Sequence, residues 1–272
     1  MYNKNISKVK LVPDSQIEYT DDIITALQWI WGDGYLAPGG PEEVAKMLQG
    51  VELEGYHVLD VGSGLGSIDA LLVEQYDVQS VIGIDVEPHL IKYARQRVED
   101  ARLHEKVSFQ LVKPGPFPFN DNVFDMVFSK DSIVHINDKV AFYEDVIRVL
   151  KPGGLFVGSD WLCADEKTYT KEVQEYLKIV NLTYHMETPQ QTRQVIIKVG
   201  FENVTLRDRN KWYQKEVKNE LKALSGDKLI QLADLIGKDK ADYRLKVSSI
   251  KQKVIEQGFL RPTHIICYKP CI

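Results

Sequence analysis

Residues 57–66 read HVLDVGSGLG, an apolar run with one carboxylate, Asp60, followed by three glycines at every second position. An apolar run that meets glycines in this way is typical of a buried parallel strand turning sharply into a helix. Glycine lets the backbone bend tightly there and lets a ligand approach it. A second apolar run, VIGI at 81–84, ends at Asp85. A carboxylate about twenty residues past such a loop is placed to bind ribose hydroxyls, so the pattern predicts a nucleoside-containing cofactor.

The spacing of the glycines indicates which kind of nucleoside cofactor is bound. They are Gly62, Gly64 and Gly66, and Ser67 occupies the position at which a dinucleotide fingerprint has its third glycine. A pyrophosphate needs the N-terminus of the helix clear for an anion. Asp60 before the loop instead favours a ligand that carries an ammonium or a sulfonium. A glycine loop alone does not establish a ligand site, because tight strand–helix turns that bind no ligand also contain such loops.

Strand and helix patterns alternate along most of the chain. The expected strands cover 56–61, 80–84, 106–111, 123–128, 154–160, 203–207 and 261–268. The expected helices between them cover 66–75, 88–101, 138–149 and 189–199. Alternation with short connections predicts a doubly wound α/β sheet that is mostly parallel, is covered by helices on both faces and has its last strand antiparallel. Ligands of such sheets bind at the carboxyl ends of the strands.

Two segments with helical patterns interrupt this alternation, 165–186 and 210–258. We expect both to be lid insertions over the ligand edge of the sheet rather than separate domains. Residues 17–50 carry two helical patterns and are expected to form an N-terminal helical cap, and 55–160 are expected to form the cofactor-binding core. The chain is therefore interpreted as a single domain over 1–272.

Composition excludes several classes of protein. The 272 residues are 44% hydrophobic and 27% charged, with a formal net charge of −5, which argues against a general binder of nucleic acids or membrane surfaces. The three cysteines form no CxxC pair, so neither a disulfide framework nor a zinc site is indicated, and no metal is expected. No apolar run approaches the roughly 20 residues of a membrane span. We expect a soluble, cytoplasmic protein that acts on a small molecule; its oligomeric state is not indicated.

A further motif, LKPGG at 150–154, narrows the interpretation. With the glycine loop and Asp85, it resembles class I S-adenosylmethionine-dependent methyltransferases over about residues 55–160. The resemblance implies a Rossmann-like, seven-stranded sheet and S-adenosyl-L-methionine as the cofactor. The residues that it assigns to the cofactor are Leu36, Asp60, Gly62, Ser63, Gly64, Gly66, Asp85, Val86 and Lys130. That family usually offers an acidic residue to the adenine amino group, but the corresponding region here, LVKPGP at 111–116, contains none.

A narrower resemblance, to phosphoethanolamine N-methyltransferases, rests on three further motifs. These are YTD at 19–21, GG at 39–40 and DSIVH at 131–135. The resemblance implies that Tyr19 and His135 form a catalytic pair and that Asp131 binds the substrate amine. The chemistry agrees, because an alkyl ammonium cannot attack a methyl group until it loses a proton, and a histidine with a near-neutral pKa can take that proton. Each of these residues also has a structural alternative, such as a hydrophobic staple for Tyr19.

The phosphate-binding end departs from the pattern of that family. Trp161 stands where the family has a tyrosine, Val180 where it has an arginine and Leu182 where it has a second tyrosine. Tyr176 remains as a substrate-binding candidate, and Lys246 is the candidate cation. Valine in place of a bidentate guanidinium would weaken phosphate binding, whereas a tryptophan face suits a methylated ammonium.

We therefore expect an amine N-methyltransferase and hypothesise that its substrate is not phosphorylated, with phosphoethanolamine itself as an alternative. Two other interpretations stay open. One is O- or C-methylation of a hydrophobic molecule such as a quinone or a polyketide, with His135 taking a proton from a hydroxyl or an acidic carbon. The other is a non-catalytic, cofactor-binding scaffold.

Overall fold

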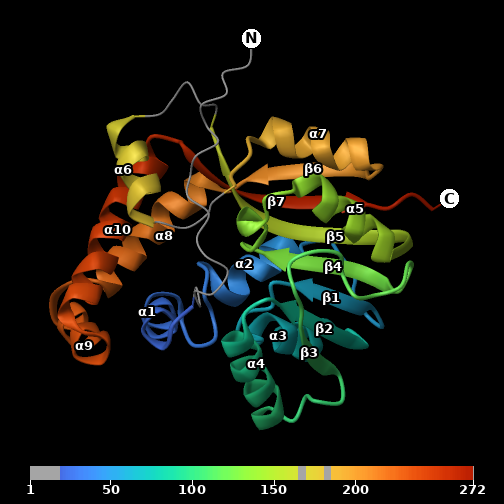
Figure 1. Cartoon of the computed structure of the whole chain (residues 1–272), viewed down its shortest axis with the longest axis horizontal. Helices are drawn as coiled ribbons and strands as arrows, with labels where there is room; N and C mark the ends of the chain where they lie inside the picture. The colour runs from blue at the N-terminus through green and yellow to red at the C-terminus, as the bar shows by residue number, and fades with distance from the viewer. Residues whose placement is uncertain (1–18, 165–169, 181–184, 272) are drawn as a thin grey trace.

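A computed structural model describes residues 19–164, 170–180 and 185–271. Within these ranges, seven strands form one sheet (Figure 1). The strands are β1 (His57–Val61), β2 (Ser80–Asp85), β3 (Val107–Leu111), β4 (Phe124–Lys130), β5 (Leu150–Cys163), β6 (Glu202–Asp208) and β7 (Leu260–Tyr268). The helices are α1 (Asp21–Trp31), α2 (Gly40–Met47), α3 (Ser67–Tyr76), α4 (Pro88–Asp100), α5 (Lys139–Val149), α6 (Lys171–Val180), α7 (Pro189–Val199), α8 (Asn210–Ala223), α9 (Gly226–Ile236) and α10 (Lys238–Glu256), with a short 3₁₀-helix η1 (Ile133–His135).

The strand order is β3-β2-β1-β4-β5-β7-β6, so the order reverses next to β1. β1 pairs in parallel with β2 on one side and β4 on the other, and β7 runs antiparallel to both β5 and β6. The expected doubly wound, mostly parallel sheet with a reversed last strand is thereby confirmed. β5 begins four residues earlier than expected, at Leu150, because that residue pairs with Phe124 of β4 before a register shift.

Both faces of the central strands are buried. Val58 of β1 packs into a cluster with residues of α2, α3 and α4, and the next residue, Leu59, packs into a second cluster with residues of α5 and α7. Strands that are covered on both faces read as continuous apolar runs rather than as alternating ones, which is why residues 57–61 show no alternation.

The helices outside this α/β core pack on one another. α10 contacts α6, α8 and α9, while α1 packs against α8 and α9. Figure 1 shows this group of helices beyond the ends to which β4 and β6 point. The division into cap, core and lid stays an expectation, and the segment 165–186 is described only in part. None of the helices in the described ranges is long and apolar enough to cross a membrane.

Candidate functional site

The turn between β1 and α3 is shaped by its three alternate glycines. Gly62, Gly64 and Gly66 have φ angles of +80°, +55° and +77°, in the left-handed region that favours glycine. A Cβ atom on Gly62 would lie 2.4 Å from Cβ of Ser132, so no side chain fits at that position. The backbone N–H of Gly62 donates to the carbonyl of Ile84, 2.8 Å away, which fixes the turn against the end of β2.

Asp85 lies at the carboxyl end of β2, next to this turn. One carboxylate oxygen accepts the N–H of Gly64 and the other that of Glu87, both at 3.0 Å. Burial raises the pKa of Asp85, and these backbone donors oppose that rise. A carboxylate held by one donor on each oxygen keeps lone pairs for further hydroxyl donors. The neighbouring apolar side chains of Val86 and Leu111 are exposed, 49% and 46% respectively.

The surroundings of the turn fit the expected nucleoside cofactor. The hydroxyl of Ser63 is buried and has no hydrogen-bond partner among the described residues. Tyr19 and Leu36 pack with a small apolar cluster that includes Leu65 of the turn and Leu90 of α4. The turn therefore offers glycines without side chains, one unsatisfied hydroxyl and an oriented carboxylate, which together suit a ribose-bearing ligand.

Lys130 and Asp131 form an ion pair at the carboxyl end of β4. The Lys130 ammonium lies 2.7 Å from one Asp131 oxygen and also donates to the carbonyl of Pro38 at 2.9 Å. The Ser159 hydroxyl donates to the other Asp131 oxygen at 2.6 Å. Asp131 has φ +59°, a conformation that is uncommon outside glycine. The carboxylate expected to bind the substrate amine is thus already partnered on both oxygens, once by a cation.

His135 ends η1, four residues beyond Asp131, and is half-buried. Burial, together with the charges of Lys139 and His185, lowers the pKa of His135 to about 4. Lys139 itself is buried and its ammonium donates to the carbonyl of Ile133. At neutral pH, His135 is therefore uncharged and able to accept a proton, but a pKa of about 4 makes it a weaker base than the near-neutral histidine expected from the sequence.

An aromatic group lies between the sheet and the lid helices. Trp161 of β5 and Tyr213 of α8 pack edge to face with ring centroids 4.9 Å apart. Tyr176 of α6 belongs to the same buried cluster. Tyr213 is fully buried. Burial raises the pKa of its hydroxyl well above the ordinary value, and the neighbouring groups Glu220, Tyr176 and Asp131 raise it further. Tyr213 was not among the expected site residues, because its place in an amphipathic helix is equally typical of lid packing.

The candidate cation Lys246 and a second lysine, Lys251, both lie on α10, and Lys251 is the buried one. Lys246 is exposed on α10, whereas the ammonium of Lys251 lies 2.7 Å from a Glu220 oxygen. It also lies 5.4 Å from the centroid of the Trp31 ring and 5.5 Å from that of the Tyr213 ring. Two further positions depart from the family pattern in sequence. Val180 is the last residue of α6, and Leu182 lies outside the described residues.

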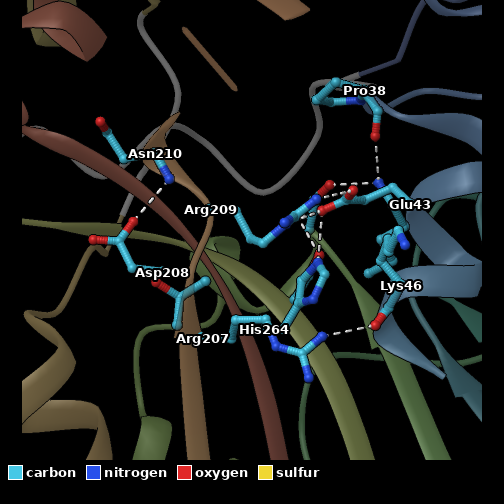
Figure 2. Close-up of polar contacts among 12 residues, drawn as sticks. Pro38, Glu43, Lys46, Arg207, Asp208, Arg209, Asn210 and His264 are labelled. Atoms are coloured by element: carbon cyan, nitrogen blue, oxygen red, sulfur yellow. Dashed lines mark hydrogen bonds and ion pairs between the residues drawn. The ribbon is translucent and has the colours of Figure 1, made fainter. Parts of the chain in front are cut away.

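A second buried ion cluster joins α2 to β7 and to the start of α8. Figure 2 shows Arg209 and His264 pointing toward Glu43. Arg209 binds both oxygens of Glu43 at 2.7 Å, and the Nε2 atom of His264 lies 2.7 Å from one of them. Burial by itself would raise the pKa of Glu43, but these hydrogen bonds and charges lower it to about 2. The Arg209 guanidinium is therefore fully engaged with a carboxylate.

Comparisons with known proteins show the family and the fold of the chain. A family model described as a methyltransferase domain matches residues 52–224. The chain is 31% identical over 239 residues to phosphoethanolamine N-methyltransferase 1 of Arabidopsis thaliana, which covers 88% of this chain and 47% of that protein. It is also 28% identical over 260 residues to the Plasmodium falciparum phosphoethanolamine N-methyltransferase, which covers 90% of this chain and 93% of that protein.

The chain thus spans about half the length of the plant relatives that it matches. Among solved structures, it is similar to Haemonchus contortus phosphoethanolamine N-methyltransferase 2 in complex with phosphomonomethylethanolamine and S-adenosylhomocysteine. The TM-score is 0.85 at 25% sequence identity, covering 93% of this chain and 58% of that one. The mycobacterial cyclopropane synthase MmaA2, at 16% identity and a TM-score of 0.79, shares the fold.

Proposed function

The chain belongs to the methyltransferase domain family, and on this premise we propose that it transfers a methyl group from S-adenosyl-L-methionine to the amine of a small, non-phosphorylated molecule. The cofactor part is supported by the Haemonchus relative, whose structures hold S-adenosylhomocysteine or S-adenosyl-L-methionine. It is also supported by the glycine turn and by Asp85 at the end of β2. When bound, this cofactor supplies an electrophilic methyl group on a sulfonium.

The amine acceptor is supported by three side chains with separate roles. We assign Asp131 to holding the substrate ammonium, since its carboxylate is buried at the carboxyl end of β4; the ammonium would share this carboxylate with Lys130. We assign His135 to taking the proton that the ammonium must lose, since burial keeps the imidazole uncharged at neutral pH. Tyr19 packs beside Leu65 of the glycine turn, and we assign it to hydrogen bonding with His135 over the bound substrate.

The non-phosphorylated acceptor is supported by one observation above all: among the described residues, three buried or partly buried cations are paired with carboxylates, while a fourth, Lys139, donates to the carbonyl of Ile133. The pairs are Lys130 with Asp131, Arg209 with Glu43, and Lys251 with Glu220, each at 2.7 Å. A phosphate dianion requires cations and donors that are not already neutralised. In the part of the chain that the structure describes, Lys251 next to Glu220 would present no net positive charge to such a group. A neutral or zwitterionic amine meets no such penalty.

Kinetics with matched acceptors test this function. We expect S-adenosylhomocysteine release with ethanolamine-type or larger neutral amines to exceed release with the corresponding phosphate esters by at least about tenfold in kcat/KM, about 1.4 kcal/mol. Glu220→Gln should keep the contacts to Trp31 and Tyr213 but free the charge of Lys251. This variant should therefore improve the phosphorylated acceptors relative to the neutral ones. Efficient turnover of phosphoethanolamine by the unaltered protein would contradict the non-phosphorylated acceptor.

A second candidate, O-methylation of a hydrophobic molecule, is favoured by the aromatic group around Trp161. The chain is also 31% identical over 141 residues to the erythromycin 3''-O-methyltransferase of Saccharopolyspora erythraea, covering 48% of this chain. In this case His135 would take a proton from a hydroxyl. Hydroxylated acceptors in the same assay discriminate the two functions, because an amine N-methyltransferase gives methylated nitrogen only.

A further inference from the structure

Asp69 is a fully buried acid beneath the glycine turn, and the proposed mechanism does not use it. It lies in the first turn of α3 with 0% of its surface exposed. Neither of its carboxyl oxygens has a hydrogen-bonding donor among the described residues. An ionised carboxylate that is buried without donors is costly, so the protonation state of Asp69 needs an explanation.

The position of Asp69 is set by a glycine in the neighbouring strand. A Cβ atom on Gly83 would lie 2.7 Å from the Oδ1 atom of Asp69, so the carboxyl group lies against the backbone of β2 where a side chain is missing. Gly83 is the partner of Asp60 in the parallel pairing of β1 and β2. Asp69 therefore reaches the sheet beside Asp60, and the two carboxyl groups are close enough for each to affect the pKa of the other.

A hydrogen bond between two carboxyl groups requires a proton, because ionised carboxylates only accept. Asp60 is itself only 2% exposed. The negative charge of a third carboxylate, Asp85, raises the pKa of both Asp60 and Asp69. Burial and the neighbouring negative charge raise the pKa of Asp69 well above its ordinary value, and burial raises the pKa of Asp60 to about 7. The pair therefore holds a proton more readily than two solvent-exposed carboxyl groups would.

We propose that Asp69 is a positioning residue for the cofactor: it stays protonated at neutral pH and donates its proton to Asp60. The donated hydrogen bond fixes the orientation of Asp60 and leaves a single negative charge on the pair, immediately before the glycine turn. That charge suits a ligand with an ammonium or a sulfonium. This inference rests on the cofactor part of the proposed function, and it is independent of the acceptor.

Two variants of Asp69 separate a proton donor from a residue that only fills space. Asp69→Asn keeps a donor at the same position, so we expect its dissociation constant for S-adenosyl-L-methionine, measured by calorimetry, to stay within about threefold of the unaltered protein. Asp69→Leu keeps the branching at Cγ, with larger methyl groups and no donor, and we expect its affinity to fall by at least tenfold. If Asp69 only packed against β2, leucine would bind the cofactor as well as asparagine does, and the proposal would be overturned.

Infrared difference spectroscopy of the cofactor-free protein supplies a readout besides binding. At pH 7, subtracting the spectrum of Asp69→Asn from that of the unaltered protein should reveal a protonated carboxyl band. Asp160→Asn, which removes a different buried acid with a pKa of about 7, should leave that band in place.

Absence of the band in a protein that binds the cofactor overturns the inference alone. Failure of the unaltered protein to bind the cofactor refutes the proposed function as well. An Asp69→Asn protein that cannot fold also contradicts the inference, because the amide should replace a protonated carboxyl.

Discussion

Asp131 combines an uncommon backbone conformation with a fully partnered carboxylate. Non-glycine residues in the left-handed region cost on the order of 1–3 kcal/mol, and they persist where their surroundings hold them. Here the Asp131 N–H donates to the carbonyl of Ser159 at 2.8 Å, while the Ser159 hydroxyl and Lys130 bind the side chain. Strain of this kind next to an expected substrate contact supports a role in binding rather than in stability.

Asp131→Asn tests that role, because asparagine tolerates the same backbone conformation. Loss of the negative charge should lower kcat/KM for the amine by at least about 30-fold, corresponding to about 2 kcal/mol, and leave cofactor affinity unchanged. Ser159→Ala removes one hydrogen bond but keeps the charge, so its effect should be smaller. Steady-state kinetics paired with calorimetry measures both quantities. Equal kcat/KM values for Asp131→Asn and the unaltered protein would rule out the assigned role.

The pKa of His135 is lowered mainly by burial and further by the charges of its neighbours Lys139 and His185. Lys139→Met removes the nearby positive charge, which should raise the pKa of His135 from about 4 toward its ordinary value of 6.5. Because protonated histidine cannot accept a proton, the acid limb of the pH–kcat profile should move to higher pH in this variant. Histidine resonances followed by NMR titration check the pKa directly. An acid limb that stays in place while the His135 resonance shifts would show that His135 is not the base.

At the scale of elements, α1 connects α8 and α9 to α4 of the α/β core, where its Asp21 accepts hydrogen bonds from His89 and Tyr93. The indole N–H groups of Trp29 and Trp31 donate across to α8, to the Ala223 carbonyl and to Glu220, each at 3.1 Å. The segment that follows α1 is bound in turn by Lys130 through the Pro38 carbonyl. The helix that follows Tyr19 and the end of β4 before Asp131 are thereby linked through one segment.

Glu43 connects α2 to β7 and α8, and Glu43→Gln tests how much this connection stabilises the fold. The variant leaves Arg209 buried beside an uncharged group, so the free energy of unfolding at pH 7 should fall by about 3 kcal/mol. The folded pKa of about 2 lies below the ordinary value of 4.5, so the stabilisation is present above about pH 4.5 and is lost as the pH falls toward 2. Urea unfolding at pH 7 and pH 3 measures the difference between the two proteins. A difference that does not shrink at pH 3 would contradict the account.

The elements that could be predicted from the sequence are those with local signals. Glycine spacing after an apolar run predicts β1 and the start of α3, since both depend on backbone requirements within ten residues. The buried ions could not be predicted in this way. Lys246 and Lys251 lie five residues apart on α10, which places them on different faces of the helix, and only packing shows which one is buried. The same applies to Asp69, whose burial depends on the missing side chain of Gly83 in another strand.

For the molecule as a whole, the sheet places the residues that we assign to the cofactor and to the acceptor at the same ends of neighbouring strands. Asp85 follows β2, the glycine turn follows β1, and Asp131 follows β4, in the spatial order β2-β1-β4. The strand order reverses at this point, where ligands of doubly wound sheets bind. The helices expected to form the lid contribute aromatic rings and the Lys251–Glu220 ion pair, which has no net charge. Such surroundings favour the proposed neutral acceptor over a phosphate ester.

The central claim is that this site methylates the nitrogen of a non-phosphorylated amine. The most direct measurement is a competition in one reaction, with S-adenosyl-L-methionine carrying a ¹³C-labelled methyl group and equal amounts of a neutral amine and its phosphate ester. We expect NMR to find the label on nitrogen and predominantly in the neutral amine. Label on oxygen or carbon, label predominantly in the phosphate ester, or no transfer to any acceptor would contradict this claim.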